Sequence, residues 1–215
     1  MIPAIVVRYS KSQPYAPVRA AMLQFTAKRN AETADEIWLV EHPPVYTLGQ
    51  AGRREHLLRD TGIPLVHTER GGQITYHGPG QVIAYVLVDL CRRGIKVRQF
   101  VTILEDAVLR VLAAYNLRGE KKPGAPGVYV AHGGELQKIA ALGLKVSNGC
   151  TFHGVSLNVA MDLTPFSDID ACGYPGLKAI DMAALGVKAG AGEVARGLAD
   201  ALIVEIERKD DNVSP

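Results

Sequence analysis

The stretch KIAALGLKVSNGCTFHGVSLNV, residues 138–159, places two β-rich runs on either side of an Asn-Gly pair. The runs are 138–146 and 151–159, and Asn148-Gly149 separates them. Asn-Gly favours a two-residue hairpin turn, because both residues tolerate positive φ. The pattern predicts an antiparallel hairpin.

This turn also decides which residues pair across the hairpin. The expected pairs are Ala141 with Ser156, Gly143 with Gly154, and Leu144 with His153. Cys150 pairs with Ser147 beside the turn, and Ser147 is nine residues along the strand from Lys138. At about 3.3 Å per residue, roughly 30 Å would separate Cys150 from Lys138. We therefore expect that these two side chains do not form a catalytic pair.

Strand-like and helix-like segments alternate along the rest of the chain. The patterns predict strands at 2–8, 36–40, 45–48, 63–67 and 81–90, and helices at 18–28, 99–115 and 193–208, with a weaker helix at 179–185. The Pro- and Gly-containing linker 121–127 is too short to indicate a second domain. One domain over residues 1–215 is expected.

Composition excludes several classes of protein. Of the 215 residues, 47% are hydrophobic and 21% are charged, which is typical of a globular domain. With 24 basic and 22 acidic side chains the net charge is only +2, so bulk charge does not favour nucleic acid or a membrane surface as a partner.

The three cysteines, Cys91, Cys150 and Cys172, are odd in number and form no CxxC motif. This argues against a disulfide framework and against a structural zinc site. The chain starts without a basic and then apolar leader, and no run approaches about 18 apolar residues. We expect a cytoplasmic protein with free thiols.

A polar, glycine-rich segment, RGGQITYHGPG at 70–80, leads into an apolar run. Glycines let a backbone approach a ligand closely and leave N–H groups free to donate. A polar loop that merely turns tightly is the alternative. The segment matches neither GxxxxGK[ST] nor GxGxxG, the two common phosphate-binding patterns.

Lys138 and Cys172 are the other candidates for chemistry. Lys138 precedes residues that look buried, and burial would lower its amine pKa, although an amine in water at a strand edge fits as well. Cys172 lies in the loop DIDACGYPG, 168–176, where a thiol has no packing role, and a nucleophilic thiol needs such access. Cys91 is interpreted as a small apolar residue at a strand end. His77 and His153 lie among glycines, and each could equally be structural.

RGGQITYHGPGQ at 70–81, KIA at 138–140, TFHG at 151–154, Asn158 and Cys172-Gly173 follow the order and spacing of the lipoyl(octanoyl) transferases. On these motifs the chain resembles that family from about His42 to Gly176. The resemblance implies an α/β (α+β) fold of the biotin/lipoate ligase catalytic-domain type, with mixed β-sheets flanked by helices. It implies no cofactor and no metal.

The resemblance also implies an activity and a set of site residues. An octanoyl group would pass from acyl carrier protein to a lysine of lipoyl domains, in the E2 subunits of 2-oxoacid dehydrogenases and in the glycine cleavage H protein. This is the first step of lipoate formation on these proteins. The family's nucleophile falls on Cys172 and its assisting lysine on Lys138. The substrate-binding residues would be Arg70, Gly71, Gly72, Gln73, Ile74, Thr75, Tyr76, His77, Ala141, Leu142, Gly143, Gly154, Val155 and Ser156, with His153 in a supporting place.

The residues fit this chemistry. A thioester donor suits a cysteine nucleophile, and the resulting acyl-enzyme stays activated for attack by an amine without ATP. Backbone N–H groups near Gly72, His77, Leu142 or Gly143 are candidates to stabilise the oxyanion. The acyl chain is expected against Leu142, Val155 and Tyr76.

Two alternatives have different requirements. A lipoate or biotin ligase of the same fold activates a free acid as an adenylate and also uses a lysine on this strand, but it needs no nucleophilic thiol. A binding module for carrier or lipoyl domains would have no need for Cys172, although both Cys172 and Lys138 are present. For docking, a basic patch that would meet acidic carrier helices is expected among Arg53, Arg54, Arg59, Arg92 and Arg93.

Overall fold

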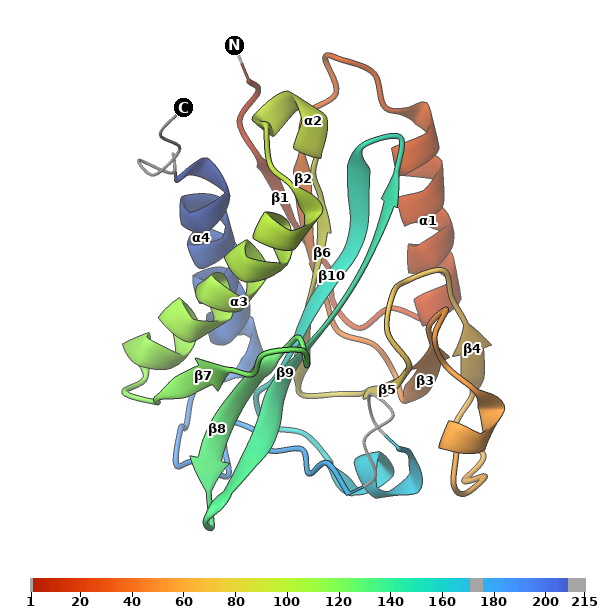
Figure 1. Cartoon of the computed structure of the whole chain (residues 1–215), viewed down its shortest axis with the longest axis vertical. Coiled ribbons are helices and arrows are strands. Elements are labelled where there is room, and N and C mark those ends of the chain that lie inside the picture. The colour runs from red at the N-terminus through yellow and green to blue at the C-terminus, as the bar shows by residue number, and fades with distance from the viewer. Residues whose placement is uncertain (1, 171–175, 209–215) are drawn as a thin grey trace.

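The computed structural model describes residues 2–170 and 176–208, which form two mixed β-sheets flanked by helices (Figure 1). The larger sheet has the order β1 (Val6–Tyr9), β2 (Glu36–Val40), β6 (Gln81–Leu87), β10 (Cys150–Asn158), β9 (Glu135–Ser147), β8 (Val128–His132) and β7 (Gly119–Lys121). The smaller sheet has the order β4 (Leu65–His67), β3 (Val45–Leu48) and β5 (Ile74–His77). The remaining elements are α1 (Tyr15–Lys28), α2 (Leu90–Arg93), α3 (Val97–Ala114), α4 (Ala191–Glu207), and the 3-10 turns η1 (Arg54–His56) and η2 (Thr164–Asp168). The fold class expected from the resemblance is confirmed.

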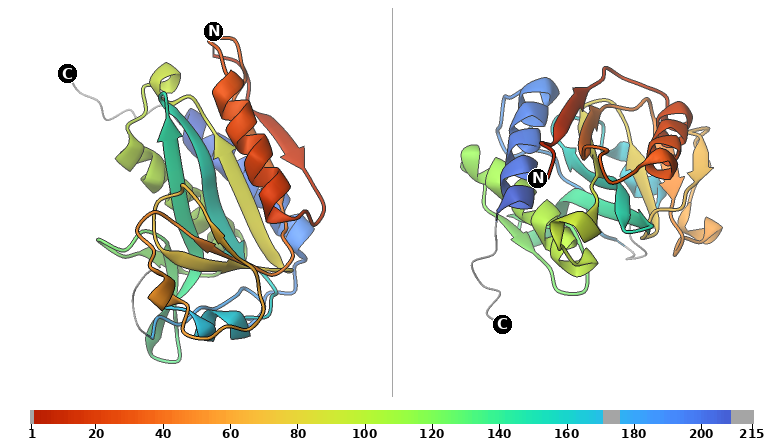
Figure 2. Two further views of the ribbon diagram at one scale, coloured as in Figure 1. Left: turned by 90° about the vertical axis from the view of Figure 1, so that its right-hand side faces the viewer. Right: turned by 90° about the horizontal axis from the view of Figure 1, so that it is seen from above.

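The helices cover opposite faces of the larger sheet. Helices α3 and α4 pack on one face, and α1 and the smaller sheet lie on the other (Figures 1 and 2). Phe100, Leu104 and Leu198 are fully buried in the first layer, and Met22 of α1 is fully buried in the second. The central strand β6 is buried along its whole length, as its unbroken apolar sequence requires.

The predicted hairpin is strands β9 and β10, and its register is confirmed. Ala141 pairs with Ser156, Gly143 with Gly154, and Leu144 with His153. Asn148 and Gly149 have φ of 49° and 77°, the left-handed values that the turn demands. This hairpin, together with β6, forms the floor of the site described below.

The sequence patterns were wrong in three places. Residues 74–77 form β5 rather than a loop. This strand pairs with β3, and the side chains of Ile74 and Tyr76 pack against those of β3. Cys91 lies on the short helix α2, which the Asp89 side chain caps by accepting from the Arg92 N–H, and is exposed rather than at a strand end. Residues 179–185 form turns instead of a helix. Strands β7 and β8 border the Pro- and Gly-rich linker, which hid them.

Within the described residues, no helix is both long enough and apolar enough to span a bilayer.

Candidate active site

A cavity of about 450 Å³ lies between the hairpin, the smaller sheet and the start of α3. Such a volume is in the range of small-molecule sites. The lining includes every described residue predicted from the resemblance except Tyr76: Lys138, Arg70, Gly71, Gly72, Gln73, Ile74, Thr75, His77, Ala141, Leu142, Gly143, Gly154, Val155, Ser156 and the supporting His153. The fold therefore brings three distant segments to one place.

Tyr76 faces away from this cavity. Its ring packs against the rings of Tyr46 and Phe166, with centroids 5.7 and 5.5 Å away. Successive side chains of a strand point to opposite faces, so β5 presents Thr75 and His77 to the cavity and Tyr76 to the other side. The expectation that Tyr76 contacts the acyl chain is corrected.

The open edge of β9 exposes backbone groups to the cavity. Strand β8 pairs with β9 only as far as Ala140, and the Gly71 N–H donates to the Leu144 carbonyl at 2.8 Å. The Leu144 carbonyl therefore points away from β10. In an antiparallel ladder, residues two apart direct their N–H and C=O groups to the same side, so those of Leu142 also face the cavity, and those of Gly143 face Gly154. Of these two candidate oxyanion donors, the geometry favours Leu142.

The Lys138 side chain is buried at the end of this cavity. Its ammonium donates to the Pro126 carbonyl at 3.1 Å and lies 5.1 Å from the centroid of the Tyr129 ring. Only 7% of the residue is exposed, so the alternative of an amine in open water is wrong. The amine is therefore enclosed by the protein rather than surrounded by solvent.

A short loop forms the cradle of this amine. Gly127 has a φ of 138°, and a Cβ there would lie 2.8 Å from the Ala140 carbonyl and 2.9 Å from Lys138 Cε. The Gly127 N–H donates to the buried Glu105 carboxylate of α3 at 2.9 Å. The loop is thus hydrogen-bonded to α3 on one side and contacts Lys138 on the other.

Cys172 lies outside the described residues, but the chain on both sides of it can be placed. Before it, the Asp170 N–H donates to the His56 carbonyl at 2.8 Å. After it, the Lys178 carbonyl accepts from the Lys138 N–H at 2.9 Å, and the Ile180 N–H donates to the Lys138 carbonyl at 3.0 Å. A second, small cavity of about 20 Å³ is lined by Lys138 and by both flanks, through Phe166 and Leu177.

His77 belongs to a chain of buried amides. The Gln81 Nε2 amide donates to Asn158 Oδ1 at 2.9 Å, so Gln81 Oε1 is left to accept from His77 Nδ1 at 2.7 Å. His77 Nε2 then accepts from the Thr47 hydroxyl at 3.2 Å. Burial lowers the pKa of His77 to about 3, so the ring is neutral. Asn158 continues the chain to the Ile180 carbonyl beside Lys138.

His153 forms a second polar group on the cavity wall. Its Nε2 lies 3.1 Å from Glu69 Oε1, and Arg19 binds the other carboxylate oxygen at 2.6 Å. Burial lowers the pKa of His153 to about 4, even though Glu69 opposes this shift. The backbone of His153 has a φ of 63°, which is uncommon for a residue with a side chain. His153, which was predicted to support the site, therefore has Glu69 as its polar partner.

The chain was compared with known proteins. A model of the lipoyl protein ligase A/B catalytic domain matches residues 14–185. An octanoyltransferase of Paraburkholderia phytofirmans is 59% identical over 209 residues, covering 94% of this chain and 87% of the relative. One of Dechloromonas aromatica is 54% identical and covers 97% of this chain and 100% of the relative. The chain belongs to the octanoyltransferase family.

Solved structures show the same fold at low sequence identity. The bipartite lipoate protein ligase of Thermoplasma acidophilum aligns with a TM-score of 0.74 at 14% identity, covering 98% of this chain and 87% of that one. This chain thus shares its fold with a lipoate protein ligase, so the fold does not distinguish a transferase from a ligase.

In this octanoyltransferase, Arg70 supports the glycine-rich segment. Its guanidinium donates to the Gly71, Thr47 and Gln73 carbonyls at 2.9, 2.6 and 2.8 Å. The residue is only 8% exposed. Because a guanidinium offers five N–H donors in a fixed fork, it can fix several carbonyls of one loop at once. Arg70 holds the cavity wall in shape as well as lining it.

The other two thiols lie away from the site. Cys150 pairs with Ser147 at the hairpin turn, as predicted, and burial raises the pKa of its thiol. Neither Cys91 nor Cys150 lines the cavity. That neither thiol takes part in the reaction stays a prediction. For Cys150 the hairpin register supports it.

Two residues of the expected docking patch are internal. Arg92 and Arg93 bind the fully buried Asp35 carboxylate at 2.6 and 2.5 Å, and their side chains are only 14% and 7% exposed. Arg59 is exposed but pairs with Asp168 at 3.5 Å. The predicted patch, which was to include some of these five arginines, is therefore limited to the exposed Arg53, Arg54 and Arg59.

Sequence reasoning missed several lining residues of this octanoyltransferase family member. Tyr15, Ile83, Tyr85, Val97 and Val101 lie in ordinary apolar patterns, which do not distinguish a cavity wall from a core. Glu105 did carry a signal, since a charged residue on the apolar stripe of a helix needs a buried partner. In the part of the chain that the structure describes, no three metal-binding side chains cluster.

Proposed function

We propose that this octanoyltransferase moves an octanoyl group from a carrier-bound thioester to a lysine of a lipoyl domain, through a thioester on Cys172. The carrier is acyl carrier protein, and the acceptors are the lipoyl domains of 2-oxoacid dehydrogenases and the glycine cleavage H protein. The observation that carries the proposal is the position of Lys138. Its amine is buried at the cavity end, and its strand is hydrogen-bonded to the segment that follows Cys172.

The first half-reaction forms the acyl-enzyme. The Cys172 thiolate attacks the carbonyl carbon of the donor, and the carbon–sulfur bond to the carrier then breaks. Lys138 gives its proton to the departing carrier thiol. The Leu142 N–H stabilises the negative oxygen that forms between these two events; removing one such donor costs about 3–4 kcal/mol in a studied protease.

The second half-reaction releases the product. The acceptor lysine amine attacks the Cys172 thioester, Lys138 accepts the proton from that amine, and Cys172 leaves as the thiolate. Sulfur-to-nitrogen transfer is downhill, so no nucleotide is consumed. The neutral His77 and Gln81 hold the cavity wall beside these steps without entering them.

The test is a comparison of two acyl sources. Octanoyl-carrier protein should modify an apo lipoyl domain without ATP, and free octanoate with ATP should not. The product lysine is identified by peptide mass. Efficient modification from octanoate and ATP would instead assign the chain to the ligase chemistry of its structural relatives.

A further inference from the structure

The cavity has an apolar rim that is open to solvent. Val97, the first residue of α3, lines the cavity and is still 48% exposed. Gly124, in the loop after β7, also lines the cavity and is exposed. Val97 therefore leaves an apolar surface exposed at the mouth of the cavity.

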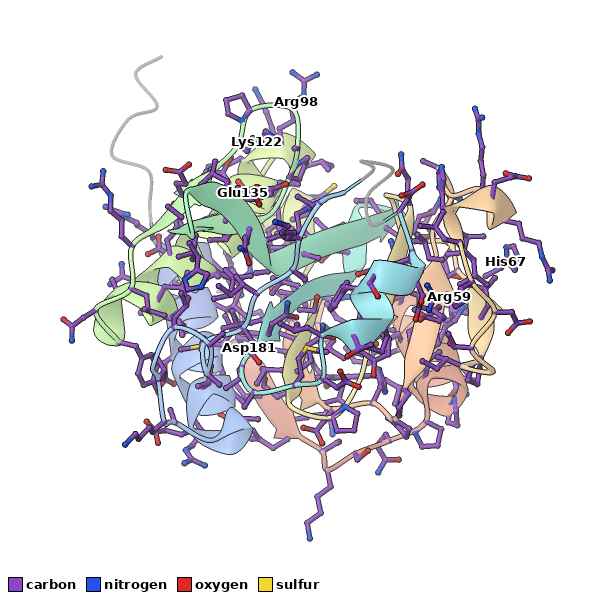
Figure 3. The ribbon with its side chains drawn as sticks, turned by 90° about the horizontal axis from the view of Figure 1, so that it is seen from below. Arg59, His67, Arg98, Lys122, Glu135 and Asp181 are labelled. Atoms are coloured by element: carbon purple, nitrogen blue, oxygen red, sulfur yellow. The ribbon has the colours of Figure 1, made fainter. Side chains whose placement is uncertain are left out.

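Three cations surround this rim. Lys96 and Arg98 flank Val97 in sequence, Lys122 precedes Gly124, and all three are exposed. Figure 3 shows the labelled Arg98 and Lys122 at the same edge of the molecule. Over residues 2–170 and 176–208, none of the three forms an ion pair.

Nearby charges do not neutralise this edge. Lys121 is paired with Asp106 at 2.6 Å, and Glu135, also labelled in Figure 3, is paired with Lys178 at 2.7 Å. These pairs cancel internally, and among the described residues the exposed cations Lys96, Arg98 and Lys122 outnumber Glu120 of β7, which is exposed and forms no ion pair. An excess of exposed positive charge steers an acidic partner toward the surface that bears it.

We propose that this basic lip, Lys96, Arg98 and Lys122 around Val97, is the docking surface for the acidic carrier protein that delivers the acyl thioester. The proposal rests on the proposed function. The carrier is preferred over the acceptor because its thioester arm brings both a phosphodiester and an acyl chain. The cations of the lip would bind the phosphodiester, and Val97 would contact the acyl chain as it enters the cavity.

The lip lies on elements that the sequence-predicted patch does not use. Arg53 caps the N-terminus of η1, Arg54 is its first residue, and Arg59 lies in the bend after it. Ala51, which precedes them, also lines the cavity. The two surfaces can therefore be separated by mutation.

The experiment reverses the lip charges in the triple variant Lys96→Glu, Arg98→Glu and Lys122→Glu. We expect kcat/KM for octanoyl-carrier protein at low salt to fall by roughly tenfold or more, and the loss to shrink as salt screens the charges. Transfer from a small donor, octanoyl-N-acetylcysteamine, should stay within about twofold of the unaltered protein, since a small thioester needs no docking.

The matched control reverses Arg118, Lys188 and Arg196, which are exposed and do not line the cavity, and should leave the use of both donors unaffected. Replacing the same three residues of the lip with alanine should give a smaller loss of kcat/KM for the carrier and again leave the small donor unaffected. This milder variant shows that the loss does not come from misfolding. An increase in KM for the lipoyl domain alone would assign the lip to the acceptor and overturn the proposal, as would unchanged use of the carrier. Failure of the proposed function is distinguishable, because the unaltered protein would then not use the small thioester.

Discussion

At the scale of single residues, the Lys138 amine is positioned by contacts that leave little freedom. It donates to the Pro126 carbonyl, lies over the Tyr129 ring, and touches a loop whose glycine leaves no room for a side chain. The Tyr129 hydroxyl in turn donates to the Ala125 carbonyl at 3.0 Å, so the loop and the ring are fixed together. A proton carrier that serves both half-reactions needs such a fixed position.

Gly127→Ala tests this cradle. The new methyl group would collide with the Ala140 carbonyl and Lys138 Cε, so the amine must move. We expect the transfer rate to fall by roughly 10- to 100-fold, with the circular dichroism of the folded chain retained. The control is Gly133→Ala, a positive-φ glycine with open space around it, which should lose little activity. Equal losses in both variants would show that backbone strain, not the amine position, controls the rate.

The buried His153 makes stability depend on pH in a defined direction. Its pKa falls from 6.5 to about 4 on folding, so the unfolded chain binds the extra proton between these values. The free energy of unfolding should therefore decrease as the pH drops from 6.5 to about 4. The Glu69 carboxylate, with a lowered pKa in the folded state, adds its own loss only below its usual 4.5.

His153→Asn should weaken this dependence and leave the part contributed by the buried His77, and Asn tolerates the left-handed backbone. The measurement is urea unfolding at pH 7, 6 and 5, with His132→Asn as an exposed control that keeps the slope. Arg19 still binds Glu69 in the variant. An unchanged slope between pH 6.5 and 5 would contradict the assignment of His153 as a neutral, buried group.

At the scale of elements, α3 supports the site through one carboxylate. Glu105 is 7% exposed and accepts from the Gly127 N–H of the cradle loop. Glu105→Leu should leave that donor buried without an acceptor and cost about 1–3 kcal/mol of unfolding free energy, together with a loss of transfer. Glu105→Gln keeps a carbonyl acceptor and should recover most of both. Urea unfolding and initial rates measure the two effects, and equal behaviour of Leu and Gln would contradict this role.

The elements also show what the sequence could predict. The hairpin and its register were predictable, because an Asn-Gly turn is local chemistry that fixes every pair after it. Residues 74–77 were not, because glycines on both sides hid a short strand that pairs with β3. Tyr76 was placed in the cavity wall by the shared motif at 70–81, whereas strand alternation directs its side chain to the opposite side.

The site residues divide in the same way. Lys138, Arg70, Thr75 and His77 were predicted from motifs, and the structure brings them around one cavity. Their partners were not predictable, because the links from His77 to Gln81 and Asn158 join β5 of the smaller sheet to β6 and β10 of the larger sheet. Glu105 and the cradle loop likewise meet only after α3 packs on β8 and β9.

At the scale of the whole molecule, two sheets and α3 enclose a cavity whose far end is Lys138. The larger sheet supplies Lys138 and the open edge of β9, and the smaller sheet supplies the glycine-rich segment and His77. The chain that enters and leaves the Cys172 segment is bonded to His56 and to the strand of Lys138. In the proposed function, the Cys172 thiol and the Lys138 amine serve the carrier and the lipoyl domain in turn.

The central claim is that Cys172 holds the acyl group between the two partners. The most direct test mixes the protein with octanoyl-carrier protein without acceptor and maps the adduct by peptide mass spectrometry. The account predicts one octanoyl group on the peptide that contains Cys172, labile to hydroxylamine, discharged by apo lipoyl domain, and absent in Cys172→Ala. An adduct on Cys91 or Cys150, or transfer that continues in Cys172→Ala, would contradict it.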